Sequence, residues 1–368
     1  MGRPLAYLDW AATAPVRPEA VAAMAEAAKL VGNPASVHGP GRRARALLDD
    51  ARRRIARAFG LEAEGLVLTS GGTEANQLAL HQARGTVAVS AVEHASILEA
   101  VPEAIRLPVT AEGVLDLEAV ERLLAEHRPA LVACQLANNE TGAIQPVCEL
   151  ARIVRRIGAQ LHVDAVQAAG KLACAPELLG ADTVAVSAHK LGGPMGVGAL
   201  LLRPGLGLRP RQPGGGQELG RRAGTPNLPG AAGFAAAVEL LSALDWRPVE
   251  GLRKRLEVAL AAVAPELRVV AAGAPRLPTI ACLLTPGLPA ETQVLALDLD
   301  GVAVGAGAAC SSGKLAPSHV LLAMGFAEAE ARAAIRVSLG WSTGATEIDR
   351  LVEAWGALYR RFRARRAA

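Results

Sequence analysis

Short apolar runs alternate with amphipathic stretches along the first part of the chain. The runs are rich in β-branched residues and lie near 66–69, 86–90, 130–135, 160–164, 183–187 and 197–202. The stretches between them, such as 118–127 and 149–158, have the spacing of helices with one buried face. Strands that alternate with helices predict an α/β fold built on a mostly parallel sheet.

The pattern changes after the last of these runs. A Gly/Pro-rich stretch at 203–216 is followed by an alanine-rich segment, 230–244, which reads as one long helix. Further strand signals come at 279–284 and 335–339. We therefore expect a second unit and place the boundary near Leu244. A hydrophobic fraction of 51% over 368 residues is enough for two such cores.

The net charge and the length of the apolar runs exclude two classes of partner. The formal net charge is only +4, the charged residues are dispersed, and aromatic residues make up 3% of the chain, so nucleic-acid binding is not expected. The first residues lead straight to the polar Asp9, and no apolar run has the length of a membrane-spanning helix. We expect a cytoplasmic protein without a membrane partner.

Two polar residues at predicted strand ends carry the first chemical signal. Of the 39 basic residues only five are lysines, and Lys190 comes directly after the apolar run 183–187. Asp164 ends the preceding run in the same way. Carboxyl ends of neighbouring parallel strands share one edge of a sheet, where ligands bind. A desolvated lysine forms a Schiff base with an aldehyde, and a carboxylate stabilises a protonated ring nitrogen. Alone, each residue reads as a loop lysine or a capping aspartate; together they predict a pyridoxal phosphate site.

A phosphate cradle is predicted beside this pair. The run 66–69 leads into a Gly-rich segment that contains Gly72 and Thr73 and opens a helix, whose free N–H groups favour an anion. Ser187 and His189 flank Lys190 and are expected to bond the same phosphate. Gln167, three residues after Asp164, is expected to donate to the ring hydroxyl.

Five motifs occur in an order that resembles a known family. They are TSGGTEAN (69–76), ANNETG (137–142), HVDAVQ (162–167), SAHK (187–190) and RAGT (222–225). With these motifs the chain closely resembles, over almost its whole length, the cysteine desulfurases of the NifS/IscS branch. The resemblance implies the pyridoxal phosphate-dependent aminotransferase fold (fold type I) and a homodimer. Residues 13–244 would form the large cofactor-binding domain, and 245–368, joined by 1–12, a smaller α+β domain.

The resemblance also implies roles for individual residues. His94 would stack on the cofactor ring and act as an acid and base, and Asn139 would orient the cofactor and the substrate. Arg336 would grip the carboxylate of L-cysteine. Thr225 would reach the phosphate bound in the partner subunit. Lys190 would carry the cofactor and move the α-proton. No metal site is predicted, because the histidines show no ligand spacing.

The reaction itself is indicated by Cys310. It lies in the small-residue segment 305–313, which is similar to the loop that carries the desulfurase nucleophile. Its thiolate would take the substrate sulfur as a persulfide, leave alanine, and pass the sulfur to a protein such as an iron–sulfur scaffold or a sulfur-relay protein. The chain ends about one helix after Gly340, without the longer tail with which some relatives grip a scaffold protein, so the acceptor stays open.

Two other functions remain possible from the sequence. One is a different pyridoxal phosphate enzyme of the same fold, such as an aminotransferase or a selenocysteine lyase. The other is a non-catalytic sulfur carrier or scaffold. Cys310 favours a desulfurase over the first, and the combination of Lys190, Asp164 and Arg336 favours it over the second. The pathway served, iron–sulfur cluster assembly or tRNA thiolation, is not fixed.

Overall fold

The central feature of the fold is a twisted sheet that holds every strand predicted for the first part of the chain. The computed structural model describes residues 5–307 and 316–367. Within these residues the sheet has the strand order β2-β8-β7-β6-β5-β3-β4. Its strands are β2 (Leu66–Thr69), β3 (Val87–Ser90), β4 (Ile105–Leu107), β5 (Leu131–Gln135), β6 (Gln160–Asp164), β7 (Thr183–Ser187) and β8 (Gly198–Leu202). All neighbours are parallel except β8, which runs antiparallel to β2 and β7. The predicted α/β class with a mostly parallel sheet is confirmed.

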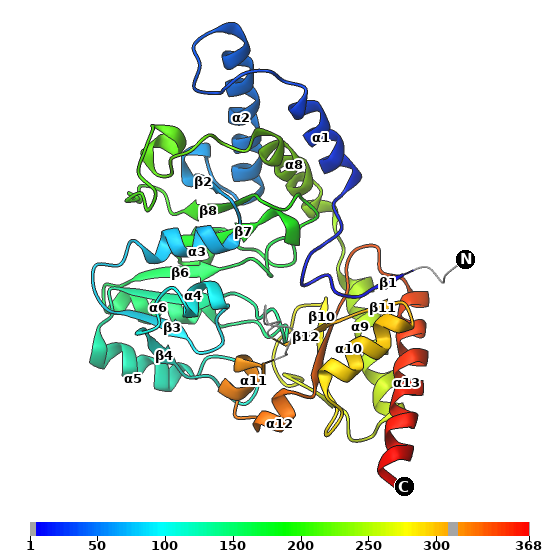
Figure 1. Ribbon diagram of the computed structural model, residues 1–368. Coiled ribbons are helices and arrows are strands. Elements are labelled where there is room, and N and C mark those ends of the chain that lie inside the picture. The colour runs from blue at the N-terminus through cyan, green and yellow to red at the C-terminus, as the bar shows by residue number, and fades with distance from the viewer. Residues whose placement is uncertain (1–4, 308–315, 368) are drawn as a thin grey trace.

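Helices cover both faces of this sheet and extend beyond it (Figure 1). They are α1 (Pro18–Ala28), α2 (Gly39–Ala58), α3 (Gly72–Leu80), α4 (Ala95–Leu98), α5 (Leu117–His127), α6 (Val147–Arg156), α7 (Pro176–Leu179) and α8 (Leu228–Glu239). Helix α8 is almost wholly buried and packs against α1 and α2. It ends at Glu239, short of the predicted limit, and a separate 3₁₀ turn, Leu241–Ala243, follows. The apolar residues on one face of the sheet belong to the largest core cluster, and those on the other face belong to two smaller clusters.

The C-terminal part packs beside the sheet (Figure 1). Its helices are α9 (Arg247–Val263), α10 (Ala290–Leu299), α11 (His319–Ala323), α12 (Glu328–Ala331) and α13 (Ala345–Ala367). An antiparallel sheet, in the order β12-β13-β10-β9, is made of β9 (Arg268–Val269), β10 (Ile280–Leu284), β12 (Gly305–Ala306) and β13 (Ala334–Ser338). A second core cluster, centred on Trp355 of α13, fills the space between this sheet and its helices.

The N-terminal segment joins the C-terminal part before it enters the large sheet. Strand β1 (Ala6–Tyr7) pairs in parallel with β11 (Val302–Ala303), and Asp9 bridges to Ser338. Ala11 and Ala12 then pass over the carboxyl edge of the large sheet, where their carbonyl oxygens meet Lys190. The domain limits inferred from the sequence stay a prediction.

Taken singly, no helix in the described part of the chain combines the length and the apolar character needed to cross a membrane. The pair 228–243 and 247–263, bent by 80°, meets those two criteria only when its helices are counted together.

Candidate active site

Lys190 lies at the carboxyl edge of the large sheet. It ends the 3₁₀ helix Ala188–Lys190, which follows β7 without a break. Its Nζ donates hydrogen bonds to the carbonyl oxygens of Ala11 and Ala12, at 2.6 and 2.7 Å. Burial, and after it the positive charge of Arg336, lower the Lys190 pKa to about 8. The amine is therefore much closer to neutrality at physiological pH than an ordinary lysine.

Asp164 ends the neighbouring strand and is fixed by two hydrogen bonds. Its Oδ2 accepts from Asn76 Nδ2 at 2.7 Å, and its Oδ1 accepts from the backbone N–H of Val166 at 2.8 Å. Asn76 Oδ1 in turn accepts from His162 Nε2 at 3.0 Å, which orients the amide so that its NH₂ group faces Asp164. Burial lowers the His162 pKa to about 3, so this histidine stays neutral and can hold Asn76 without adding a charge.

The predicted cradle lies at the first turn of α3. A cavity of about 450 Å³ is lined there by Gly72, Thr73, Ser187 and His189, among others. Ser187 is buried, and its Oγ has no hydrogen-bond partner among the described residues. A Cβ added to Gly72 would lie 2.7 Å from Val166 Cγ2, so only glycine fits there. Burial, and then the charge of Lys190, lower the His189 pKa to about 4, which leaves its imidazole neutral.

His94 stands at the other side of the cavity and is held through one ring nitrogen. It caps α4, and its Nδ1 accepts from the backbone N–H of Ser96 at 3.1 Å. The Ser96 hydroxyl accepts from Asn76 Nδ2 at 2.9 Å and lies 2.9 Å from the same Nδ1. With Nδ1 an acceptor, the proton of the neutral ring is on Nε2. His94 and Asp164 thus share Asn76 as a common support.

Glu93, next to His94, is completely buried. Its Oε1 accepts from the backbone N–H of Gln135 at 2.6 Å, and its Oε2 has no partner among the described residues. Burial, and then the negative charge of Asp164, raise the Glu93 pKa well above its usual range. The raised pKa favours the protonated form of the Glu93 carboxyl.

Arg336 reaches the site from β13. Its Nη2 forms an ion pair with Asp9 at 2.7 Å, and its Nη1 donates to the carbonyl oxygen of Asn139 at 3.0 Å. Its Nε is buried without a partner among the described residues. Gly305, opposite Arg336 across β12 and β13, makes room for the guanidinium, since a Cβ at Gly305 would lie 2.7 Å from Nη2. One donor edge of the guanidinium therefore remains for a ligand.

These groups open into one cavity of about 910 Å³. Ten of the predicted residues line it: Gly72, Thr73, His94, Asn139, Asp164, Gln167, Ser187, His189, Lys190 and Arg336. A lysine amine, a buried carboxylate and a guanidinium that face one space can bind an aldehyde cofactor together with an amino acid. The Gln167 amide donates to the Ala11 carbonyl oxygen at 2.8 Å and has a second N–H left to donate.

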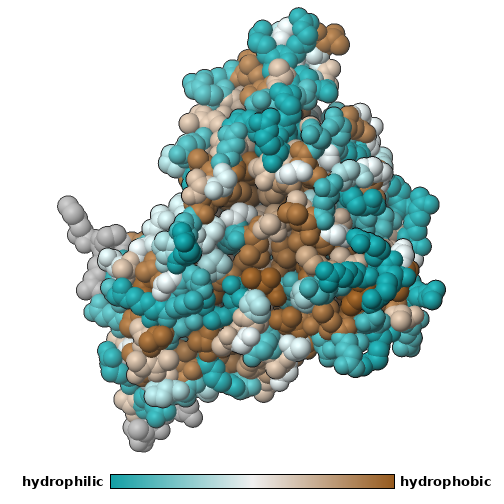
Figure 2. Space-filling view, turned by 180° about the vertical axis from the view of Figure 1, so that it is seen from behind, coloured by the Kyte–Doolittle hydropathy of each residue, from teal (hydrophilic) through white to brown (hydrophobic). Residues whose placement is uncertain are grey.

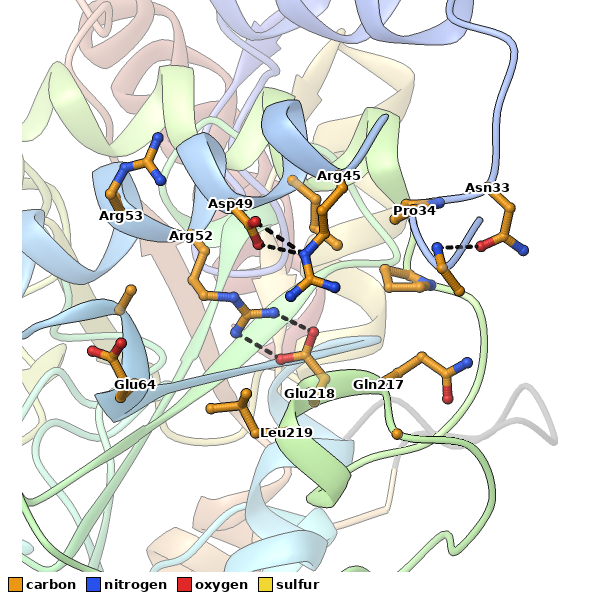
Figure 3. A pocket seen from close by; sticks show the side chains of 15 residues that line it. Asn33, Pro34, Arg45, Asp49, Arg52, Arg53, Glu64, Gln217, Glu218 and Leu219 are labelled. Atoms are coloured by element: carbon orange, nitrogen blue, oxygen red, sulfur yellow. Dashed lines mark hydrogen bonds and ion pairs between the residues drawn. The ribbon is translucent and has the colours of Figure 1, made fainter. Parts of the chain in front are cut away.

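A separate polar cavity of about 570 Å³ lies between the 33–35 loop, α2 and residues 216–219 (Figure 3). Figure 3 shows Arg52 and Glu218 facing each other, and their ion pair closes at 2.5 Å. Glu218 also accepts from the backbone N–H of Leu68 in β2, at 2.8 Å. A few residues later Arg222 pairs with Glu74 of α3 at 2.8 Å. These contacts fix the segment that leads to Thr225 against the strand and helix of the cradle.

Comparison with known proteins assigns the family. The sequence profile described as Aminotransferase class-V matches residues 6–351. A cysteine desulfurase of Cereibacter sphaeroides is 43% identical, and the match covers 94% of each chain. The chain belongs to the cysteine desulfurases of the class-V aminotransferase family. The IscS-like cysteine desulfurase of Mycobacterium tuberculosis is 36% identical over 99% of this chain and 98% of its own. The NifS-like protein from Rickettsia africae has a TM-score of 0.89 and 32% identity, over 97% of this chain and 99% of its own.

Enzymes of this family use pyridoxal phosphate, and the residues present in this desulfurase fit that group. The unpartnered Ser187 hydroxyl and the start of α3 offer donors to a phosphate. A Cβ at Gly72 would collide with Val166, so the first turn of the cradle has no room for a side chain there. Asp164 faces the same cavity from the next strand.

Two predicted residues of the desulfurase are not among the described residues that line this cavity. Cys310 lies outside the described residues, and its role stays a prediction. Thr225 is exposed and lines a different cavity, beside Ser70. Its assignment to the partner subunit's phosphate also stays a prediction.

Sequence reasoning assigned no role to several residues that support the site. Asn76 and His162 both lie within the family motifs, but only the contact between them shows that they orient Asp164. Glu93 and Lys171 likewise gave no signal, because their chemistry depends on burial.

Proposed function

We propose that this desulfurase binds pyridoxal phosphate through Lys190, removes the sulfur of L-cysteine to leave alanine, and passes the sulfur on through Cys310. One observation carries the proposal: Lys190, Asp164 and Arg336 face a single cavity from three different strands or strand ends. An amine, a carboxylate and a guanidinium in that arrangement match an aldehyde, a ring nitrogen and a substrate carboxylate in turn.

The cofactor would be held by groups whose hydrogen bonds within the protein leave them available to bind it. Gly72, Thr73, Ser187 and His189 would hold its phosphate, and Asp164 would keep a proton on its ring nitrogen. When bound, pyridoxal phosphate withdraws electrons from the substrate α-carbon. His94, oriented by Ser96, would cover the ring and exchange a proton through Nε2.

Lys190 would act as the base of the reaction. With a pKa of about 8, about one tenth of the amine is neutral at pH 7, against about one part in 3,000 for an ordinary lysine. The neutral amine can take a proton from the substrate α-carbon and return it to another carbon. The carbonyl oxygens of Ala11 and Ala12 accept from Nζ and hold the amine in place between these transfers.

The substrate would be oriented by Arg336. The ion pair with Asp9 and the bond to Asn139 fix the plane of the guanidinium, and the buried Nε–H remains as a donor. A carboxylate that accepts from this edge gains a charge-assisted hydrogen bond. L-Cysteine bound in this way would have its α-carbon toward Lys190 and its sulfur toward the rest of the cavity.

Sulfur transfer would use Cys310. Residues on both sides of its segment line the main cavity, Gly305 to Gly307 before it and His319 after it. The Cys310 thiolate would form a bond to the substrate sulfur while the C–S bond breaks. The carbon keeps the electron pair, takes a proton and leaves in alanine. The persulfide on Cys310 then passes its outer sulfur to an acceptor protein, such as an iron–sulfur scaffold or a sulfur-relay protein.

We further propose a homodimer in which Thr225 approaches the phosphate in the partner subunit. Thr225 is exposed at the end of a segment anchored by the Arg52–Glu218 and Arg222–Glu74 pairs. Large apolar side chains, among them Val31 and Val37, are 81% and 87% exposed. Figure 2 shows hydrophobic residues gathered in the middle of one face. Exposed apolar surface of this kind is typical of protein–protein interfaces.

Reductive trapping tests the attachment of the cofactor. The protein is incubated with pyridoxal phosphate, reduced with borohydride, digested and mapped by mass spectrometry. The proposal predicts a pyridoxyl group on Lys190 and its loss in Lys190→Ala, with no change in Lys254→Ala, whose side chain is 64% exposed. Labels spread over several lysines, or none on Lys190, would contradict the proposed site.

A further inference from the structure

A second lysine lies behind the catalytic one. Lys171 follows Gly170, whose φ of +75° makes the turn that brings the chain back toward Lys190. Its Nζ donates to the backbone carbonyl oxygen of Gln167 at 2.8 Å and lies 6.0 Å from the centre of the Trp246 ring. Trp246 is held in turn by a bond from its Nε1 to the Gly170 carbonyl oxygen, at 2.8 Å.

Both lysines bind next to Gln167, through different groups. Lys190 Nζ and the side-chain amide of Gln167 both donate to the carbonyl oxygen of Ala11, at 2.6 and 2.8 Å. Lys171 donates to the backbone carbonyl oxygen of Gln167. Lys171 therefore holds the backbone of the residue whose side chain shares an acceptor with Lys190.

The space between the lysines is small and largely closed to water. Both line a cavity of about 10 Å³, together with Trp10, Trp341 and Thr279. That volume holds about one water molecule. Thr279 is 1% exposed, and its Oγ1 has no partner among the described residues. Within this small cavity there is little water to screen one ammonium group from the other.

We propose that Lys171 is a positioning residue of the catalytic site, which fixes Gln167 and places a second positive charge behind the Lys190 amine. The inference rests on the proposed function of Lys190. A nearby positive charge disfavours the protonated form of an amine. Lys171 thus helps to keep Lys190 in the form that reacts.

The charges around both groups agree with this assignment. Arg336 lowers the Lys190 pKa, while Asp9 and Asp164 raise it. Burial, and then the charge of Lys190, lower the Lys171 pKa to about 8, and Cys174 acts in the opposite direction. Burial and Arg336 are the leading causes of the lowered Lys190 pKa. Because electrostatic coupling is reciprocal, the inference adds the charge of Lys171 to them. His189, also near Lys190, is neutral at pH 7 because its pKa is about 4.

Competitive labelling measures this coupling. The full-length protein, freed of pyridoxal phosphate, is treated with limiting acetic anhydride between pH 6 and 11, and labelled lysines are quantified by mass spectrometry. In Lys171→Met the Lys190 curve should move up by at least half a pH unit, which is about threefold less free amine at pH 7. Lys171→Arg keeps the charge and should retain the wild-type curve. Lys29→Met, at a side chain that is 70% exposed, is the matched control.

A reciprocal measurement does not depend on the Lys171 variants. In Lys190→Ala the Lys171 labelling curve should also rise, because both experiments remove the same repulsion between the two amines. If the Lys171→Met variant does not fold, the Lys171 labelling curve in Lys190→Ala decides whether the inference holds. Unchanged curves in either experiment overturn the inference.

A different result would contradict the proposed function. If borohydride leaves no pyridoxyl group on Lys190, the cofactor attachment is wrong whatever the labelling shows. A pyridoxyl-labelled Lys190 together with an unshifted curve in Lys171→Met would reject only the role of Lys171.

Discussion

The buried ion pair between Arg52 and Glu218 gives the sharpest stability prediction. The Glu218 side chain is 2% exposed and the Arg52 side chain 12%. Glu218 accepts two N–H groups of Arg52 and one from Leu68. Glu218→Gln keeps the shape of the side chain but leaves the Arg52 charge buried without its carboxylate. Loss of one partner of a buried pair costs about 3–5 kcal/mol.

This loss of unfolding free energy predicts a lower melting temperature. An unfolding entropy of about 2.1 cal/mol/K per residue gives about 0.8 kcal/mol/K for this chain, so the midpoint should fall by about 4–6 °C. Circular dichroism during heating measures it. The matched control is Asp49→Asn, which removes the exposed ion pair of Arg45 and Asp49 in the same cavity (Figure 3). That change should cost about 0.5 kcal/mol or less.

A double-mutant cycle completes the test. Arg52→Met combined with Glu218→Gln should cost less than the two single changes added together, by about 1–3 kcal/mol, because the pair no longer contains an isolated charge. Additive costs, or a Glu218→Gln midpoint equal to that of Asp49→Asn, would refute the reasoning. It would mean that the segment leading to Thr225 is held by other contacts.

Three further changes probe the site directly. Glu93→Gln should flatten the pH dependence of the free energy of unfolding. Because the pKa of Glu93 is raised, the folded state binds its proton more tightly, and wild-type stability falls as pH rises above the usual carboxyl range. Denaturant unfolding between pH 5 and 8 measures the difference between the two proteins. Gly72→Ala places a Cβ 2.7 Å from Val166 and should weaken binding of pyridoxal phosphate by about tenfold or more. Fluorescence titration measures the affinity. The control is Gly207→Ala, where a Cβ meets nothing within 4 Å. Asp164→Asn should lower turnover of L-cysteine by about a hundredfold or more, because the charge opposite the ring nitrogen is lost. The rate of alanine formation measures the turnover. An unchanged rate would remove Asp164 from the mechanism.

The pairing of Lys190 with Asp164 could be predicted because it depends on topology alone. Asp164 ends one strand of strongly apolar sequence, and Lys190 comes three residues after the end of the next. Parallel neighbours place their ends at one edge. Strand limits were predicted to within one or two residues for the same reason. The antiparallel direction of β8 was not predicted. Its connection from β7 holds only about ten residues, too few for the crossover helix that a parallel neighbour needs.

The supporting residues could not be predicted because their roles depend on contacts between distant segments. Asn76 binds Asp164 across 88 positions, and Gln167 reaches Ala11 across 156. The end of α8 was also misplaced. Its sequence stays rich in apolar residues to Leu244, but the regular helix stops at Glu239, and Pro248 helps to open α9 in a new direction. Helix propensity does not register such a bend.

The central claim is that sulfur leaves L-cysteine through a persulfide on Cys310 while Lys190 moves the proton. The most direct measurement incubates the pyridoxal phosphate-loaded protein with L-cysteine and a reductant, and quantifies alanine and sulfide together. The account predicts equal amounts of both products from the wild type and loss of turnover in Cys310→Ala and Lys190→Ala. Sulfide and alanine that still form at the wild-type rate in Cys310→Ala would contradict it and place the sulfur chemistry on another group.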